Sequence, residues 1–208
     1  MTQKRVDYEV VVEKDAIVGE GSLWDPDEKV LYWIDILSHQ LYIYDPASGA
    51  NRTIETAQAV GTVVKRQKGG LMLALHNGFA HIDPETEKIT PVGIDPERSV
   101  PANRFNDGKC DPAGRFWAGT MEFGGEKDQG ALYCLDVDHT VSKKVSPVSI
   151  SNGIVWSADH KTMYFIDTGT NNVRAYDYAV DSGAIANERV VVTNEGTGGF
   201  DGMAIDAE

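Results

Sequence analysis

Among the side chains with a carboxylate or amide oxygen that stand immediately before a glycine, four recur at widely spaced positions along the chain. They are Glu20, Asp107, Asn152 and Asp201. Such oxygens are the ligands that hard divalent cations prefer, Ca²⁺ above all, with Mg²⁺, Mn²⁺ and Zn²⁺ also compatible. If the fold gathers these side chains, we expect them to form a divalent-cation site. The alternative is that Asp-Gly and Asn-Gly are simply favourable turn dipeptides.

The same pairs mark the starts of a repeat. When Val60-Gly61 is included, the residue before the glycine stands at 20, 60, 107, 152 and 201, so successive starts are 40, 47, 45 and 49 residues apart. Residues 21–35 align with residues 153–167 without a gap, with tryptophan at the fourth position and aspartate at the last. A repeat of this length favours the blades of a β-propeller. A β-sandwich is the alternative, but it gives no reason for a recurring start.

Each complete unit contains short β-rich runs separated by turns rich in Asp, Pro and Gly. In the first unit the predicted strands are residues 22–24, 30–34, 41–44 and 52–54. The first strand of a propeller blade lines the central channel, so the residue before it lies near the channel mouth. The sequence therefore predicts an all-β protein, with a single propeller domain over residues 1–208.

The two ends of the chain do not fit whole blades. Residues 203–205 are expected to form only the first strand of a fifth blade. Residues 10–12 are expected to form an outer strand of the kind that completes the last blade of a closed propeller. We therefore expect about four and a half blades, in a fragment or one piece of a nicked protein. A missing C-terminal fragment would be the partner that completes the propeller.

The charge, the N-terminal residues and the cysteines indicate which partners and which cellular compartment to expect. The net charge of −13 argues against nucleic acid or an anionic membrane as the main partner. The first ten residues lack the apolar core of a signal peptide, and no stretch approaches the length of a membrane span. Cys110 and Cys134 are expected to be reduced core thiols in a cytoplasmic protein, with a single disulfide as the alternative.

Other chemistries have little support in the sequence. A Gly-x-Ser-x-Gly nucleophile motif and a phosphate-binding loop are both missing. The five histidines are scattered without the spacing of metal ligands, so we expect surface or turn roles for them. The four tryptophans, Trp24, Trp33, Trp117 and Trp156, recur at blade positions and are expected in the core.

Seven motifs occur in order between about residue 17 and the last residue. They are Gly19-Glu20-Gly21-Ser22-Leu23-Trp24, Asn103-Arg104-Phe105-Asn106-Asp107-Gly108-Lys109, Asp111-Pro112-Ala113-Gly114-Arg115, Ala118-Gly119-Thr120-Met121, Gly130-Ala131-Leu132-Tyr133, Ser151-Asn152-Gly153 and Asp201-Gly202-Met203. Together they resemble the gluconolactonase/regucalcin (senescence marker protein) family. The family continues for about two more blades, so the resemblance implies that its C-terminal part is lacking here.

The resemblance implies a six-bladed propeller with one divalent metal ion at the channel mouth. Members of this family hydrolyse sugar lactones, and some are described as calcium-binding proteins. Carried over by motif, the metal ligands would be Glu20, Asn152 and Asp201. The metal would be Ca²⁺, Zn²⁺, Mn²⁺ or Mg²⁺, and the partner a small sugar lactone.

The resemblance also implies roles for the neighbouring polar residues. Arg104 and Asn106 would hold substrate hydroxyls, as would Glu122, and Asp107 would stand close to the metal through water. We expect Asp201 to accept the proton of the attacking water, with Asp107 as the alternative base. Two other functions stay open: a related propeller hydrolase of aryl esters or organophosphates, and a non-catalytic calcium-binding or scaffold propeller.

Overall fold

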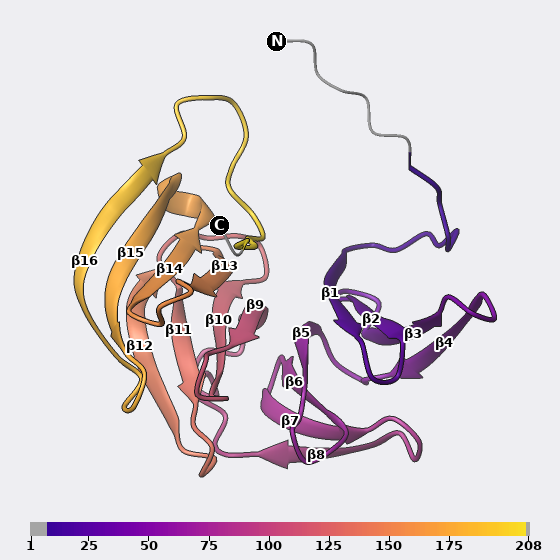
Figure 1. The fold of residues 1–208 in the computed structure, drawn as a ribbon. Helices are drawn as coiled ribbons and strands as arrows, with labels where there is room; N and C mark the ends of the chain where they lie inside the picture. The colour runs from indigo at the N-terminus through magenta and orange to yellow at the C-terminus, as the bar shows by residue number, and fades with distance from the viewer. Residues whose placement is uncertain (1–7, 207–208) are drawn as a thin grey trace.

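The computed structural model describes residues 8–206, which form sixteen strands in four separate four-stranded antiparallel sheets (Figure 1). The first sheet contains β1 (Gly19–Asp25), β2 (Val30–Asp35), β3 (Gln40–Asp45) and β4 (Ala50–Glu55). The second contains β5 (Val60–Lys65), β6 (Leu71–Leu75), β7 (Gly78–Asp83) and β8 (Lys88–Val92). The third contains β9 (Asn103–Cys110), β10 (Phe116–Glu122), β11 (Gly130–Leu135) and β12 (Val141–Val148). The fourth contains β13 (Ser151–Trp156), β14 (Thr162–Asp167), β15 (Asn172–Ala179) and β16 (Ala184–Thr193), with a single 3₁₀ turn, η1 (Thr168–Thr170), after β14.

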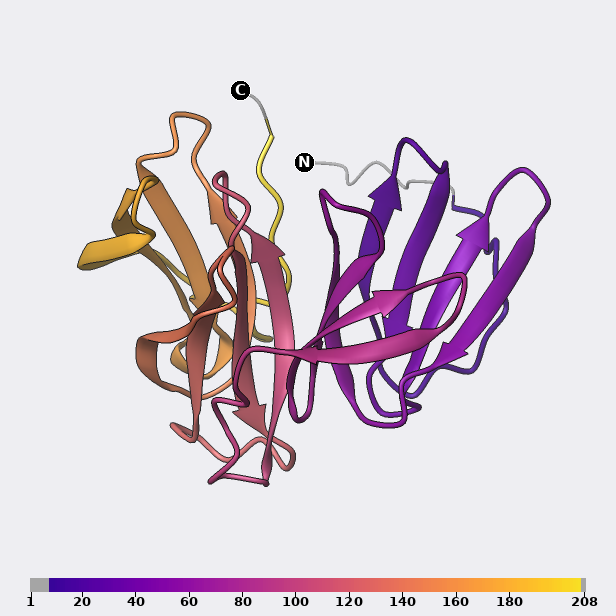
Figure 2. The same ribbon diagram turned by 90° about the horizontal axis from the view of Figure 1, so that it is seen from below.

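The first strand of every sheet lies innermost. Figure 1 shows β1, β5, β9 and β13 nearest one another, with β4, β8, β12 and β16 at the periphery. The inner strands are neighbours in space, because β5 contacts both β1 and β9, and β9 contacts β13. Figure 2 shows the first and fourth sheets at opposite ends of the row, with the other two between them. This is the blade arrangement of a β-propeller, and it confirms the predicted fold class.

The hydrophobic core is divided among the interfaces between neighbouring blades. One cluster joins the first and second blades through residues such as Ile34 and Leu73, and a second joins the second and third through Phe79 and Phe105. The third cluster joins the third and fourth blades, where the rings of Trp117 and Trp156 meet edge to face at 5.8 Å. Middle strands are therefore buried on both faces and are apolar at nearly every position.

A β-bulge interrupts the first strand of every blade. A bulge places an extra residue opposite one residue of the partner strand, which bends the strand and redirects its side chains. The register between first and second strands shifts between Glu20 and Leu23, Val60 and Thr62, Phe105 and Gly108, and Ser151 and Ile154. The recurring glycines lie in these bulges inside strands, so in the first four units they do not mark turns between strands.

At two of the bulges the glycine is required because a neighbouring segment of the chain approaches closely there. A Cβ added to Gly61 would lie 2.5 Å from the backbone of Phe105 in the next blade. One added to Gly153 would lie 2.5 Å from Cβ of Met203. At Gly21 the backbone itself is left-handed, with φ of +60°. At Gly61 and Gly153 the repeated glycine therefore reflects packing between neighbouring segments around the axis.

The aspartate that ends each aligned segment anchors the chain entering the blade. Asp35 accepts hydrogen bonds from the N–H groups of Ile17 and Val18 at 2.9 and 3.0 Å. Asp167 accepts from Ser149 and Ile150 at 3.1 and 3.0 Å in the same way. Each buried carboxylate thus satisfies two backbone donors just before an inner strand, and it fixes where that strand begins.

Three local predictions are wrong. Residues 10–12 form no strand, and Val10 and Val11 are exposed, because they run beside no strand edge in the described part of the chain. Residues 203–205 form no strand either, since the pairing with β13 stops at one bond from the Gly153 N–H to the Asp201 carbonyl. Trp24 is 50% exposed, because it lies outside the cluster between the first and second blades. By contrast, Trp117 and Trp156 are buried as predicted.

Two further points concern the expected location of the protein. Across residues 8–206 the structure has no helix long and apolar enough to cross a membrane. The prediction about a signal peptide falls largely on residues 1–7, which lie outside the described residues. Cys110 and Cys134 are free thiols, and Cys134 is buried in the core.

The first prediction concerns the close approach of inner strands. We expect Gly61→Ala to lower the free energy of unfolding by about 1–3 kcal/mol, because the added methyl group would overlap the backbone of β9. Urea denaturation followed by tryptophan fluorescence would measure the change. Gly202→Ala is the matched control, since a Cβ there meets no atom within 4 Å. Equal stability of the two variants would contradict the packing argument.

A buried polar group joins the third and fourth blades at the other end of β9. The Asp111 carboxylate accepts hydrogen bonds from Tyr178 Oη at 2.6 Å, Trp117 Nε1 at 3.0 Å and Arg115 Nη1 at 3.1 Å. Burial acts to raise the pKa of Asp111, but these hydrogen bonds outweigh it and hold the pKa below its ordinary value. Its contribution to stability is therefore present above about pH 4 and is lost as the pH falls below that.

The second prediction is that Asp111→Asn costs about 3–5 kcal/mol of stability at pH 7, because Arg115 is then buried without its main counter-charge. The matched control is Asp136→Asn, which removes a more exposed partner of Arg115 at 3.4 Å and should cost less than about 1 kcal/mol. Urea denaturation at several pH values should show the Asp111 difference shrinking below about pH 4. A difference that is constant with pH would contradict the role of the ionised carboxylate.

Candidate functional site

The bulges of three inner strands carry predicted site residues. Glu20 lies at the bulge of β1, Asp107 at that of β9 and Asn152 at that of β13. Asp201 belongs to the segment after β16, which returns to lie beside β13 (Figure 1). Because inner strands from neighbouring blades are adjacent, these side chains gather at one end of the inner strands, near the axis around which the blades are arranged.

The carboxylates are close enough to affect one another's protonation. Burial, followed by the charges of Asp201 and Asp107, raises the pKa of Glu20 above its ordinary value. Burial likewise raises the pKa of Asp107, and the charge of Asp201 adds to this. Like charges oppose ionisation when they share a poorly solvated region. The three carboxylates therefore form one cluster of negative charge contributed by the first blade, the third blade and the segment after the fourth.

Arg104 provides a positive charge near Glu20, and Lys109 provides one near Asp107. The side chain of Arg104 is buried, and burial lowers its pKa, an effect that the charge of Glu20 partly offsets. Nη1 donates to the carbonyl of Phe105 at 3.0 Å and to Oδ1 of Asn106 at 2.8 Å. The guanidinium also lies 5.9 Å from the centre of the Phe123 ring, while its buried Nε has no protein partner. Arg104 is thus held in place through Nη1, and its buried Nε–H is a hydrogen-bond donor that no group within residues 8–206 uses.

Amide side chains connect β9 to the fourth blade. Asn106 Nδ2 donates to the carbonyl of Ser151 at 2.8 Å and to Oδ1 of Asn152 at 3.2 Å. Asn152 Nδ2 donates to Oγ1 of Thr168 at 2.7 Å, and this hydroxyl donates to the carbonyl of Phe200 at 2.7 Å. The orientation of the Asn152 amide is therefore set from both sides, with its oxygen directed toward β9.

Glu122 is placed differently from the other predicted residues. It ends β10 opposite Asn103, next to Arg104 along the sheet. Its Oε2 accepts from the N–H groups of Gly124 and Glu126, at 2.7 and 3.1 Å, so the carboxylate stabilises its own loop. Within residues 8–206 no hydrogen bond or ion pair joins Glu122 to the cluster of Glu20, and its substrate-binding role stays a prediction.

The structure therefore connects six of the seven predicted residues through charge interactions or hydrogen bonds. They are Glu20, Arg104, Asn106, Asp107, Asn152 and Asp201. Their individual roles stay predictions. Sequence reasoning missed Thr168 and Phe123, which orient Asn152 and contact Arg104. Thr168 follows the repeated aspartate directly, but nothing in the repeat distinguishes it, because the first unit has Ile36 at that position.

The donor chemistry suits a hard cation, although a metal centre is not preassembled. Within residues 8–206 no group of three or more His, Cys, Asp and Glu side chains is arranged to hold a metal ion. The predicted ligand set contains only two such residues, Glu20 and Asp201, and its third member is the amide of Asn152. Two mutually repelling carboxylates with an oriented amide oxygen form an all-oxygen set, which fits Ca²⁺ or Mg²⁺ chemically.

These features define a β-propeller with a polar, carboxylate-rich cluster where its inner strands begin. The sequence pattern of the SMP-30/gluconolactonase/LRE-like region matches residues 18–208. The chain belongs to this family.

Curated relatives agree with this assignment. The YvrE protein of Bacillus subtilis (strain 168), named provisionally as a sugar lactone lactonase, is 40% identical over 204 residues. That alignment covers 95% of this chain and 68% of YvrE. Regucalcin of Xenopus laevis is 38% identical over 210 residues, covering 98% of this chain and 70% of the relative. The chain thus spans about two thirds of the length of these relatives.

Solved structures share the fold. A regucalcin from Agrobacterium tumefaciens, described as a calcium-binding protein, superposes with a TM-score of 0.88 at 29% identity, covering 93% of this chain and 65% of that one. A gluconolactonase from Xanthomonas campestris superposes with a TM-score of 0.77, covering 92% of this chain and 67% of that one. Its identity is only 18%, so it supports the fold alone.

The third prediction tests the charge cluster directly. In metal-free protein kept in EDTA, Asp201→Asn should lower the pKa of Glu20, because a neighbouring negative charge is removed. An NMR titration of the Glu20 side-chain carboxyl carbon would measure this. Asp45→Asn, at the end of β3, is the control and should leave the pKa of Glu20 unchanged. The same pKa in all three proteins would show that Asp201 does not approach Glu20.

Proposed function

We propose that this chain carries the active site of a divalent-metal-dependent hydrolase that opens a sugar lactone to the corresponding aldonic acid. The observation that supports this most is the charge coupling of Glu20, Asp107 and Asp201 beside the buried Arg104. A cluster of carboxylates with perturbed pKa values at a channel mouth is typical of a functional site. Membership of a family described as gluconolactonase supports the reaction class.

The residues proposed to hold the metal are Glu20, Asn152 and Asp201. When bound, a divalent cation would act as a Lewis acid that polarises the lactone carbonyl. The three donors are oxygens, and the repulsion between the two carboxylates would be relieved by a positive charge between them. Ca²⁺, Zn²⁺, Mn²⁺ and Mg²⁺ all remain candidates for this position.

The chain's own polar groups are proposed to bind the sugar and move the proton. Arg104 and Asn106 are fixed by their mutual hydrogen bond, and both are proposed to hold substrate hydroxyls. Asp201 accepts a proton from the attacking water as the new C–O bond forms, with Asp107 as the alternative base. The acyl C–O bond of the ring then breaks, and the released ring oxygen takes up a proton to become the hydroxyl of the aldonic acid.

Two alternatives share this site. A calcium-binding protein without catalysis would use the same oxygen ligands. The regucalcin of Agrobacterium tumefaciens is described as a calcium-binding protein. A hydrolase of aryl esters or organophosphates would need less polar contact with its substrate than Arg104 and Asn106 provide. The cytoplasmic location, and completion of the propeller by further chain, stay predictions.

The fourth prediction tests the proposal with a panel of aldonolactones in a pH-stat. Ring opening should release protons, EDTA should abolish the enzymatic rate, and at least one of Ca²⁺, Zn²⁺, Mn²⁺ and Mg²⁺ should restore it. Thermal stabilisation by the metal without turnover of any lactone would instead support the calcium-binding alternative. A rate that EDTA leaves unchanged would contradict the metal-dependent mechanism.

Asp201→Ala should lower kcat by at least about 100-fold in the same assay, because a general base contributes factors of this order. Its backbone carbonyl, which accepts from the Gly153 N–H, is retained. Glu195→Ala removes an exposed carboxylate from the same segment and should leave kcat unchanged. Near-normal turnover by Asp201→Ala would remove Asp201 from the mechanism and leave Asp107 as the candidate base.

A further inference from the structure

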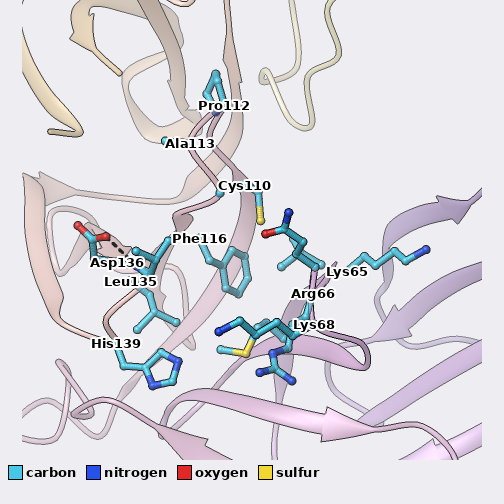
Figure 3. Close-up of a pocket in the computed structure, with 15 residues that line it drawn as sticks. Lys65, Arg66, Lys68, Cys110, Pro112, Ala113, Phe116, Leu135, Asp136 and His139 are labelled. Atoms are coloured by element: carbon cyan, nitrogen blue, oxygen red, sulfur yellow. Dashed lines mark hydrogen bonds between the residues drawn. The ribbon is translucent and has the colours of Figure 1, made fainter. Parts of the chain in front are cut away.

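A cavity of about 590 Å³ lies between the second and third blades, away from the candidate site (Figure 3). Its position follows from β9, which begins with Asn103 and Arg104 beside the site and ends with Cys110 in the wall of the cavity. The other walls come from the β5–β6 turn and the β11–β12 turn. The volume is within the range of pockets that bind small molecules.

One side of the cavity is apolar. Met72, Phe116 and Leu135 line it, and all three belong to the hydrophobic cluster between the second and third blades. Each is buried, with 7, 3 and 3% of its surface exposed, so the cavity is floored by the edge of an ordered core. A ligand with an apolar body could therefore add to this cluster without unfolding any part of it.

The opposite side carries positive charge. Lys65, Arg66 and Lys68 all line the cavity, and Figure 3 shows the Arg66–Lys68 turn facing Phe116 and Leu135. The Lys65 side chain extends away from Phe116 and is neutralised by Asp25 and Asp27 of the first blade, at 2.7 and 2.8 Å. Arg66 and Lys68 are thus the cations available to a ligand.

These two charges are not balanced within the described residues. Arg66 donates through Nη1 to the carbonyl of Gly69 at 3.0 Å, which leaves its charge unpaired, and no carboxylate forms an ion pair with Lys68. The one carboxylate of the cavity wall, Asp136, lies 3.4 Å from Nε of Arg115. The chain as a whole has a net charge of −13, so this side of the cavity differs from the molecule as a whole in sign of charge. In the described part of the chain, Arg66 and Lys68 lie there without a carboxylate partner, opposite the apolar side.

We propose that this cavity binds an amphipathic organic carboxylate. Its aromatic or aliphatic body would pack on Met72, Phe116 and Leu135, and its carboxylate would accept hydrogen bonds from Arg66 and Lys68. Bonds of this kind between charged groups are short and strong, and the planar guanidinium matches a carboxylate in two-pronged geometry. The ligand class differs from an uncharged, polyhydroxylated sugar lactone, so the site is independent of the proposed catalytic function.

The fifth prediction uses 4-phenylbutyrate as the probe, measured by isothermal titration calorimetry and by ¹H–¹⁵N chemical-shift mapping on the complete chain. The shifts should centre on residues 64–72 and 110–116. The neutral isostere 4-phenylbutan-1-ol tests the need for charge, and acetate tests the need for the apolar body. We expect both to bind at least about tenfold more weakly than 4-phenylbutyrate, because each lacks one half of the interaction.

Charge-removing variants locate the anion. Arg66→Gln and Lys68→Gln, combined, should weaken 4-phenylbutyrate binding by about tenfold or more, because charge-assisted hydrogen bonds are lost. Lys88→Gln, an exposed lysine of the same blade in β8, is the matched control and should leave the affinity unchanged. Both changed side chains lie on a turn outside the core, so folding is expected to survive and can be verified by the unperturbed far-UV circular dichroism.

Three results would overturn the proposal: no binding of 4-phenylbutyrate, equal binding of the alcohol, or equal loss of affinity in the Lys88 control. Shifts centred on Arg104 and Asn106 would likewise overturn it, since the probe would then occupy the catalytic candidate site. Excess gluconolactone should not displace the probe, and this holds whether or not the lactonase assay succeeds. Failure of either proposal can therefore be recognised separately.

Discussion

The contact on which this structure depends most is the close approach of neighbouring inner strands at their glycines. An added Cβ at Gly61 would lie 2.5 Å from the backbone of β9, a separation that no side chain could accept without moving a strand. Each bulge lies beside the residue before the glycine, and the inner strands that carry the bulges are neighbours in space. The packing of inner strands around the axis thus brings the side chains at the bulges of different blades near one another.

Gathering carboxylates in this way is unfavourable, and the structure limits the cost in two ways. The positions before the five repeated glycines are not all acidic, since Val60 and Asn152 replace carboxylates with an apolar side chain and a neutral oxygen. Arg104, buried beside Glu20, supplies a positive charge. Burial raises the pKa values of Glu20 and Asp107 most, and the repulsion that remains between the carboxylates adds to this. A bound cation would relieve this repulsion, and the relief would contribute to metal affinity.

The repeat made the blade order and the identity of the inner strands predictable, because apolar periodicity and the recurring glycine are local properties of the sequence. The sequence alignment places Asp35 and Asp167 at equivalent positions. Their role as hydrogen-bond acceptors for the entering backbone depends on tertiary contacts that the alignment does not specify. The prediction that Trp24 is buried is wrong because burial depends on which blade packs against the residue. The position of a residue within its own blade does not specify its neighbour in the next blade. The cavity between the second and third blades was missed for the same reason, since it is built from three turns distant in sequence.

Asp201 lies in a segment without regular structure that is nevertheless held in place by hydrogen bonds. After β16 the chain is fastened to the turn η1: Asn194 N–H donates to the carbonyl of Asn171 at 3.0 Å, and Thr168 Oγ1 donates to that of Phe200 at 2.7 Å. The same Thr168 hydroxyl accepts from the amide of Asn152. The Thr168 side chain therefore orients Asn152, a proposed metal ligand on β13, and positions Phe200, the residue before Asp201. Because both positions are set by the fourth blade, the relative placement of Asn152 and Asp201 does not require a fifth sheet to be formed.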